Sequence, residues 1–179
     1  MGSLLAARPT TRMTSDERHR MDETPAPSQG KGPVPFPPPA IYVTGLLLGI
    51  IVESIEPSPA LHPAITIPAA AICLGLAIYL DGSASKRFIR NKTAMIPWKP
   101  ASALVTDGPY RFTRNPMYLG MVFLYSGLAF SFGLLWAFVF LPVVILLIDR
   151  TVIAREEPYL ERLFGEGYLN YKARVRRWI

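Results

Sequence analysis

The sequence has few charged residues, and one long segment has none. Of the 179 residues, 18% are charged and 50% are hydrophobic, and the mean hydropathy is +0.26. Soluble domains usually carry about 25% charged residues. Residues 117–148 contain no Asp, Glu, Lys, Arg or His, and this run exceeds the ~20 apolar residues that cross a bilayer. The sequence therefore excludes a purely soluble protein and predicts an all-α integral membrane protein.

Cysteine and histidine are scarce as well. Cys73 stands alone, which excludes an internal disulfide and a cysteine-based metal cluster. The two histidines, His19 and His62, lie in a polar tail and a Pro-rich loop, so we expect no metal site. The net charge is +6. The basic residues are placed according to the expected membrane topology and do not form one surface with interleaved aromatic residues, as in a nucleic-acid-binding protein, so we expect no nucleic-acid partner.

The N-terminal part differs in composition from the rest of the chain. Seven prolines lie between Pro25 and Pro39, and such a segment favours extended polyproline and buries no core. We therefore expect residues 1–39 to be a disordered cytosolic arm and residues 40–179 to form a single membrane domain.

Apolar segments of helical length follow this arm. The first two cover about 40–55 and 60–80. As one straight helix, the charge-free run 117–148 would be about 48 Å long, against a hydrocarbon core of about 30 Å. Ser131-Phe132-Gly133 is the best place for a turn, which predicts a hairpin of helices near 117–130 and 134–153. We expect about four transmembrane helices, of which the last two form this hairpin.

The basic residues predict the orientation of these helices. In a four-helix arrangement, all 19 Lys and Arg residues fall on one side of the membrane. The positive-inside rule places that side in the cytosol. Both termini and the loop 81–116 are then cytosolic, in a multi-pass protein of a bacterial inner membrane.

The loop 81–116 ends in a segment rich in turn-forming, aromatic and basic residues. Asp107-Gly108-Pro109 indicates a tight turn. Asn115 and Pro116 suit the N-cap and the first turn of the next helix. A helix N-terminus beside Arg114 is suited to an anionic group such as a carboxylate. The alternative is an interfacial belt of Tyr and Arg with no ligand.

The second polar segment begins with Glu156 and Glu157, at the expected cytosolic end of the last transmembrane helix. The negative end of a helix dipole disfavours carboxylates, so Arg150, Arg155 or a bound cation should compensate them. Pro158 follows and is expected to end the helix. The alternative is a solvated acidic helix end followed by an amphipathic surface helix.

Taken together, these segments match a known pattern. Gly108-Pro109-Tyr110, Arg114-Asn115-Pro116-Met117-Tyr118-Leu119-Gly120, a charge-free hairpin, Glu156-Glu157 and Phe164-Gly165-Glu166-x-Tyr168-x-x-Tyr171 follow one another in order. This set resembles the isoprenylcysteine carboxyl methyltransferase and phospholipid methyltransferase superfamily, in its small bacterial branch, over about residues 95–179. The resemblance implies an integral membrane enzyme that uses S-adenosylmethionine, with the cytosolic loop and the C-terminal helix forming the cofactor pocket.

The resemblance also implies site residues. The cofactor-binding positions correspond to Ser102, Ala103, Leu104, Val105, Tyr110, Arg114, Asn115, Pro116, Met117, Tyr118, Glu156 and Glu157. Asn115 replaces the histidine of the family motif and cannot shuttle protons. The arginine that holds the substrate carboxylate in the eukaryotic enzymes corresponds to Val152. Arg150, with Arg155 as the alternative, is therefore our candidate for orienting the acceptor, and we nominate no general base.

The chemistry of these side chains suits the cofactor. Tyr110 and Tyr118 can offer π faces to the sulfonium or stack on the adenine. Glu156 suits the ammonium or the ribose, whereas Arg114 and Asn115 suit the carboxylate. Methyl transfer mainly requires alignment, and an acceptor carboxylate that is already ionised needs no base. The acceptor stays open among a prenylated thiol or carboxylate, a lipid amine and a small lipophilic thiol.

Two other functions compete with this interpretation. Sterol reductases, which use NADPH, have a distantly similar C-terminal half, but Pro116-Met117-Tyr118-Leu119-Gly120 lacks the Asp of their pattern. A non-catalytic membrane protein is the other alternative. A transporter needs polar groups near the membrane midplane, where the run 117–148 offers only Tyr125, Ser126, Ser131 and Trp136.

Overall fold

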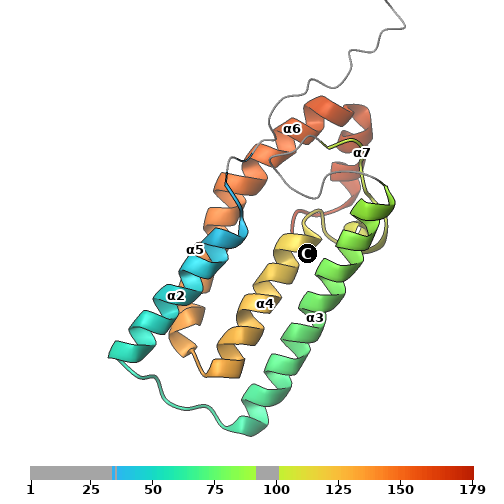
Figure 1. Cartoon of the computed structure of the whole chain (residues 1–179). Helices are drawn as coiled ribbons and strands as arrows, with labels where there is room; N and C mark the ends of the chain where they lie inside the picture. Colours follow the sequence, from blue (N-terminus) through green and yellow to red (C-terminus); the bar gives the residue numbers. More distant parts are fainter. Residues whose placement is uncertain (1–33, 35, 92–100) are drawn as a thin grey trace, which may run out of the picture.

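The structure is a computed structural model that describes residues 34, 36–91 and 101–179. These residues form helices and loops and contain no strand. The elements are α2 (Pro39–Ile55), α3 (Pro63–Arg90), the 3-10 turn η1 (Gly108–Arg111), α4 (Pro116–Phe132), α5 (Leu135–Leu147), the π-helical turn η2 (Ile148–Ile153), α6 (Ala154–Phe164) and α7 (Glu166–Arg174). Figure 1 shows α2 to α5 running side by side, with α6 and α7 at one end of the bundle.

Two helical stretches are long and apolar enough to cross a membrane, α3 and the continuous stretch Leu135–Phe164. The apolar helices α2 and α4 have 17 residues each, at the lower end of the ~17–25 residues that span a bilayer. Large hydrophobic side chains stay exposed along the bundle, among them Ile55, Ile65, Ile67, Ile78 and Phe132. An apolar surface of this kind suits contact with lipid. A span by each of the four helices stays a prediction.

The predicted helical hairpin is confirmed in position. Helix α4 ends at Phe132, and Gly133 follows as its C-cap with a φ of +67°. Glycine adopts this left-handed conformation without the steric penalty of a Cβ. Helix α5 then begins at Leu135, so the chain reverses at the expected Ser131-Phe132-Gly133.

Small residues let the helices approach closely. Helix α3 packs mainly on α4, and α2 packs mainly on α5. Ala70, Ala77 and Ala84 of α3 are buried and recur every seven residues, which keeps them on one face. On α2, a Cβ added to Gly49 would lie 2.7 Å from the Cα of Ala137 on α5. Such small residues are typical of helix contacts in membranes.

Helix α3 is longer than the sequence predicted. The expected segment ended near residue 80, whereas the helix continues to Arg90, so the following loop is shorter than 81–116. Arg87 and Arg90 occupy its last turn, where cations stabilise the helix dipole. Both also pair with Asp107, at 3.1 and 2.8 Å, and so tie the helix end to η1.

The prediction that Pro158 ends the helix is wrong. Helix α6 runs through Pro158 to Phe164. The helix is continuous from α5 through the π-helical turn into α6, and Pro158 lies inside this stretch, soon after the turn that interrupts its regular hydrogen bonds. Glu156 and Glu157 consequently lie inside a continuous helical stretch that ends at Phe164, so they are not at the helix C-terminus where an unfavourable dipole was expected.

The folded part of the chain includes the end of the expected arm. Val34 is fully buried and belongs to the apolar core, against which Phe36 packs. Pro37, Pro38 and Pro39 line a cavity. The remainder of the arm, residues 1–33 and 35, lies outside the described residues.

Candidate functional site

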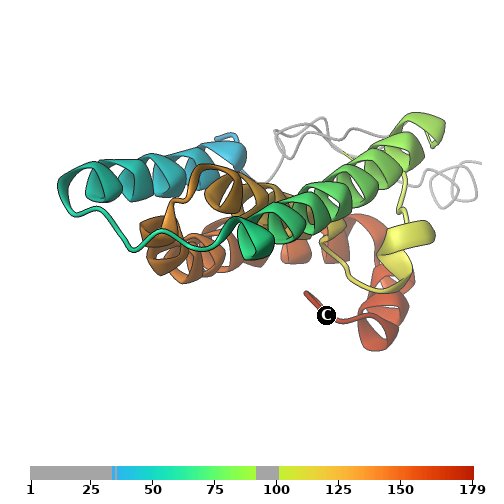
Figure 2. The ribbon, with the colours of Figure 1, turned by 90° about the horizontal axis from the view of Figure 1, so that it is seen from below.

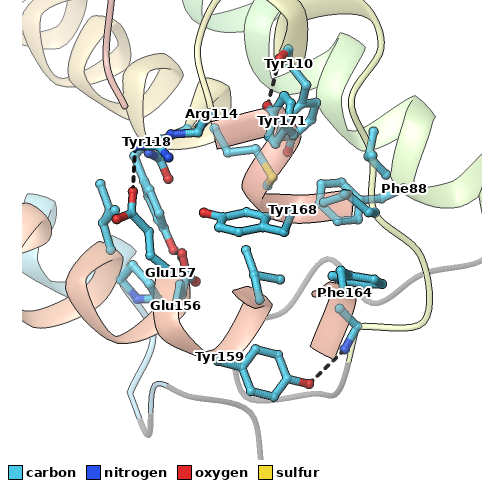
Figure 3. A pocket seen from close by; sticks show the side chains of 18 of the residues that line it. Phe88, Tyr110, Arg114, Tyr118, Glu156, Glu157, Tyr159, Phe164, Tyr168 and Tyr171 are labelled. Carbon is cyan, nitrogen blue, oxygen red and sulfur yellow. Dashed lines mark hydrogen bonds and ion pairs between the residues drawn. The ribbon is translucent and has the colours of Figure 1, made fainter. Parts of the chain in front are cut away.

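A cavity of about 320 Å³ lies at the end of the bundle where η1, α6 and α7 meet the first residues of α4. Its volume falls in the range of about 300–1,000 Å³ that is typical of ligand pockets. Figure 2 shows η1 and α7 side by side at this end, and Figure 3 shows the side chains that point into the cavity.

Most of the predicted cofactor-binding positions line this cavity. They are Ala103, Leu104, Val105, Tyr110, Arg114, Asn115, Met117, Tyr118, Glu156 and Glu157. Ser102 and Pro116 do not line it, and Pro116 is fully buried at the first position of α4. Residues from the loop before η1, from α4 and from α6 thus meet at one cavity, although they are separated in the sequence.

Arg150 lies elsewhere. Its side chain is 75% exposed, and its nearest acidic partner is Asp149 at 3.9 Å. It borders a separate hollow beside α5 and Trp178. Arg155 is exposed as well, and Val152 is fully buried in the apolar core. The arginine that lines the cavity is instead Arg114.

The two neighbouring glutamates have different surroundings. The hydroxyl of Tyr118 donates a 2.8 Å hydrogen bond to Glu156 Oε1, and no Lys or Arg of the described residues pairs with Glu156. Glu157, in contrast, pairs with Arg114 at 2.9 Å and with Arg177 at 2.7 Å, and Lys172 lies 4.0 Å from it. Arg150 and Arg155 were expected to compensate the acidic pair, but Arg114 and Arg177 neutralise Glu157, and Glu156 remains the unpaired carboxylate of the cavity.

Arg114 has hydrogen-bond donors that no residue of the described part of the chain uses. Its Nη2 binds Glu157 and its side chain is only 9% exposed. Its Nε and Nη1 are buried and have no hydrogen-bond partner among the described residues. Leaving buried donors unsatisfied is unfavourable by about 1–3 kcal/mol or more for a charged group, so such atoms in a folded protein need an explanation. An anionic ligand group in the cavity would satisfy them.

Asn115 occupies the predicted N-cap position of α4, but its side chain makes no capping hydrogen bond. Its Nδ2 donates instead to the carbonyl of Arg177, at 2.9 Å. Thr113 Oγ1 accepts a hydrogen bond from the Asn115 N–H and donates to the same carbonyl, both at 3.1 Å. Asn115 therefore anchors the segment after α7.

Aromatic side chains form another wall of the cavity. The rings of Phe88 and Tyr110 meet edge to face with centroids 5.8 Å apart, and the Tyr171 hydroxyl donates to the carbonyl of Tyr110 at 2.7 Å. Burial raises the pKa of Tyr168 to about 12 and also raises the pKa values of Tyr110 and Tyr171 well above the usual value. These phenols are therefore neutral at physiological pH.

Several lining residues were missed as site residues. Phe164, Tyr168 and Tyr171 line the cavity, and they belong to the motif quoted for the family resemblance, which was the signal available. Phe88 was expected in a loop, and Pro37–Pro39 in the arm. Neither the composition nor the motifs near these residues indicated a binding role.

The structure also explains the position of Tyr110. The tight turn predicted at Asp107-Gly108-Pro109 is confirmed as the start of η1. Gly108 has a φ of +62°, and a Cβ at this position would lie 1.9 Å from the guanidinium carbon of Arg87. Only glycine fits this close approach without strain, and the turn places Tyr110 beside Phe88.

Comparisons with known proteins identify a family. Residues 65–167, more than half of the chain, match the family described as phospholipid methyltransferase. An uncharacterized protein from Haemophilus influenzae is 40% identical over 63 residues, which are 100% of that protein and 35% of this chain. No solved structure matches the chain.

Proposed function

The chain belongs to the phospholipid methyltransferase family, and we propose that it transfers a methyl group from S-adenosylmethionine to a lipophilic acceptor at the cytosolic membrane face. The observation that carries this proposal is one cavity that combines two unsatisfied donors of Arg114 with the unpaired carboxylate of Glu156. A ligand with a carboxylate and an ammonium complements this pair of charges.

The other lining residues suit the remainder of the cofactor. Phe88, Tyr110 and Tyr168 offer aromatic faces and edges, which can stack on an adenine or attract a sulfonium. Glu157 is already neutralised by Arg114 and Arg177, so it fixes Arg114 in place instead of contacting an ammonium. We assign the ammonium to Glu156, the carboxylate to Arg114, and the base and sulfonium to the aromatic wall.

The reaction makes modest demands on the protein. S-adenosylmethionine supplies a methyl group on a positively charged sulfur, and an acceptor atom must lie in line with it. The ionisable residues lining the cavity are the two glutamates, Arg114 and tyrosines, and Glu157 is held in ion pairs. Since Glu157 is held in ion pairs and Glu156 is assigned to the ammonium of the cofactor, we propose an acceptor that needs no base, an ionised carboxylate first. The alternatives, a lipid amine or a lipophilic thiol, would have to lose a proton before they accept the methyl group.

The proposed membrane arrangement places the cavity where a lipophilic acceptor can reach it. Residues 40–179 would cross a bacterial inner membrane four times, with both termini in the cytosol and the cavity at the cytosolic face. The lining residues Met121 and Ile153 lie on the helices α4 and η2 that lead into the bundle. A lipophilic acceptor would approach from this side, where apolar residues line the cavity.

Ligand-dependent unfolding tests the proposal. The detergent-solubilised protein is titrated with S-adenosylhomocysteine and, separately, with NADPH, because a ligand that binds only the folded state raises the unfolding temperature. We expect S-adenosylhomocysteine alone to stabilise it. Stabilisation by NADPH alone would indicate the reductase, and stabilisation by neither would indicate a non-catalytic membrane protein. Mass spectrometry of lipids and small molecules after supply of methyl-labelled S-adenosylmethionine then identifies the acceptor.

A further inference from the structure

Residues 175–179, the segment after α7, connect the two charged sides of the cavity. The carbonyl of Arg176 accepts a 2.9 Å hydrogen bond from the Arg114 N–H. The carbonyl of Arg177 accepts hydrogen bonds from Thr113 and Asn115. The same segment thus holds the loop that carries Arg114.

The side chain of Arg177 holds the opposite side. Its Nε and Nη2 bind Glu157 Oε1 and Oε2 at 3.1 and 2.7 Å, and its Nη1 binds both carboxylate oxygens of Asp149 at 3.1 and 3.2 Å. Planar, bidentate contacts of this kind are the strongest that a guanidinium makes with carboxylates. All three nitrogens of Arg177 are therefore used to hold two acidic residues of η2 and α6.

The contacts of Arg177 with Glu157 determine which nitrogen atoms of Arg114 remain without a partner. Arg177 binds both oxygens of Glu157, so Arg114 shares only Oε1, through its Nη2. Its Nε and Nη1 are left without partners among the described residues. Lys172 Nζ also lies 4.0 Å from Glu157 Oε2, but it is already paired with Glu161. Without Arg177, the buried carboxylate of Glu157 would have Arg114 as its nearest cation and would bind it with both oxygens, because a buried charge needs full compensation. The free donors of Arg114 would then be consumed inside the protein.

We propose that Arg177 is a positioning residue of the cofactor site, which keeps Arg114 Nε and Nη1 available for an anionic ligand group by holding Glu157. This inference rests on the proposed function. Arg177 does not line the cavity, so it acts through Glu157 and makes no contact with the ligand.

The test separates positioning from mere stabilisation. Four variants are titrated with S-adenosylhomocysteine in detergent: Arg177→Met, Arg177→Lys, Glu157→Gln and the double variant Arg177→Met/Glu157→Gln. Their thermal unfolding is also recorded without ligand. Arg174→Met is the matched control, because Arg174 is exposed and binds the nearby Asn170 carbonyl. We expect Arg177→Met to raise the dissociation constant about tenfold, within the range of coupled side chains, and Arg177→Lys to raise it less. In the Glu157→Gln background, the same change should alter it less than about twofold.

Each contrary result has a distinct meaning. If the wild-type protein does not bind S-adenosylhomocysteine, the proposed function fails and this inference fails with it. If the wild type binds and both Arg177 variants bind equally well, Arg177 has no positioning role, even where the unfolding temperature falls. Equal losses of affinity with and without Glu157→Gln would also overturn the inference, because Arg177 would then not act through Glu157. If Arg177→Met does not fold, the same comparisons are made with Arg177→Lys.

Discussion

The hydroxyl of Tyr118 on α4 donates a hydrogen bond to Glu156 on α6, with an oxygen–oxygen distance of 2.8 Å (Figure 3). This contact orients the one carboxylate of the cavity that has no cation beside it among the described residues. It also links the Arg114-to-Tyr118 motif directly to the glutamate pair. The two parts of the family pattern are thus joined at the site by a side-chain hydrogen bond.

Replacing Glu156 by Gln should weaken binding of S-adenosylhomocysteine roughly tenfold to hundredfold, the effect of losing a hydrogen bond to a charged group. A titration in detergent or nanodiscs measures it. Glu157→Gln is not a suitable control, because Glu157 is held by two arginines and its loss disturbs Arg114. Glu166→Gln on the exposed start of α7 is the matched control and should bind normally. Unchanged affinity in folded Glu156→Gln would remove Glu156 from the site.

Replacing Gly49 by Ala should destabilise the protein by about 1–3 kcal/mol, as overpacking of a tight contact does. The added Cβ would lie 2.7–2.9 Å from the backbone and Cβ of Ala137. Gly75→Ala is the control, since a Cβ at Gly75 meets nothing within 4 Å and alanine favours a helix. Thermal unfolding in detergent compares the two variants. Equal stability of both would contradict the close packing of α2 on α5.

The orientation of the helices predicts which positions react from outside the cell. On a background in which Cys73 is replaced by Ser, single cysteines at Ser58 and Ser131 should react with an impermeant thiol reagent in intact cells. Cysteines at Ser102 and Asn170 should react only after permeabilisation. This pattern follows from the one-sided Lys and Arg residues. Labelling of Asn170→Cys in intact cells would overturn the four-helix topology.

The protein should tolerate deletions at the N-terminus only up to a defined residue. Removal of residues 1–31 should leave folding and S-adenosylhomocysteine binding nearly intact, because that part has neither apolar periodicity nor a family motif. Removal of residues 1–36 also takes away the fully buried Val34 and the adjacent Phe36. It should lower stability by a few kcal/mol, as the loss of a buried side chain and its neighbour does. Loss of binding in the shorter deletion would show that the arm takes part in the site.

The sequence predicted the elements that depend on local patterns. Charge-free runs and turn residues are local signals, so the hairpin at Gly133 and the turn at Gly108 could be found from composition and motifs. The end of α3 at Arg90 could not, because it depends on ion pairs between Arg87, Arg90 and the distant Asp107. Such pairs need the folded chain to bring them together.

The residues of the candidate site also fall into those that local motifs predicted and those that depend on distant contacts. Arg114, Tyr118 and Glu156 were found because they stand in motifs, and the structure brings them to one cavity. Arg177 was missed because it lies in a run of basic residues that resembles an ordinary cytosolic charge cluster. Its contacts with Asp149 and Glu157 span 28 and 20 residues of sequence, and no periodic pattern reports contacts of that separation.

The π-helical turn Ile148–Ile153 affects how this chain should be aligned with its relatives. Each residue of a helix advances the side-chain direction by about 100°, and a π turn amounts to one inserted residue. A relative without that insertion would match α6 in register, but at the positions before the turn it would present a side chain rotated by about 100°. Alignment of this helix with such a relative would need a one-residue gap at the turn, and the count back from Phe164-Gly165 that reaches Val152 would then be wrong by one residue.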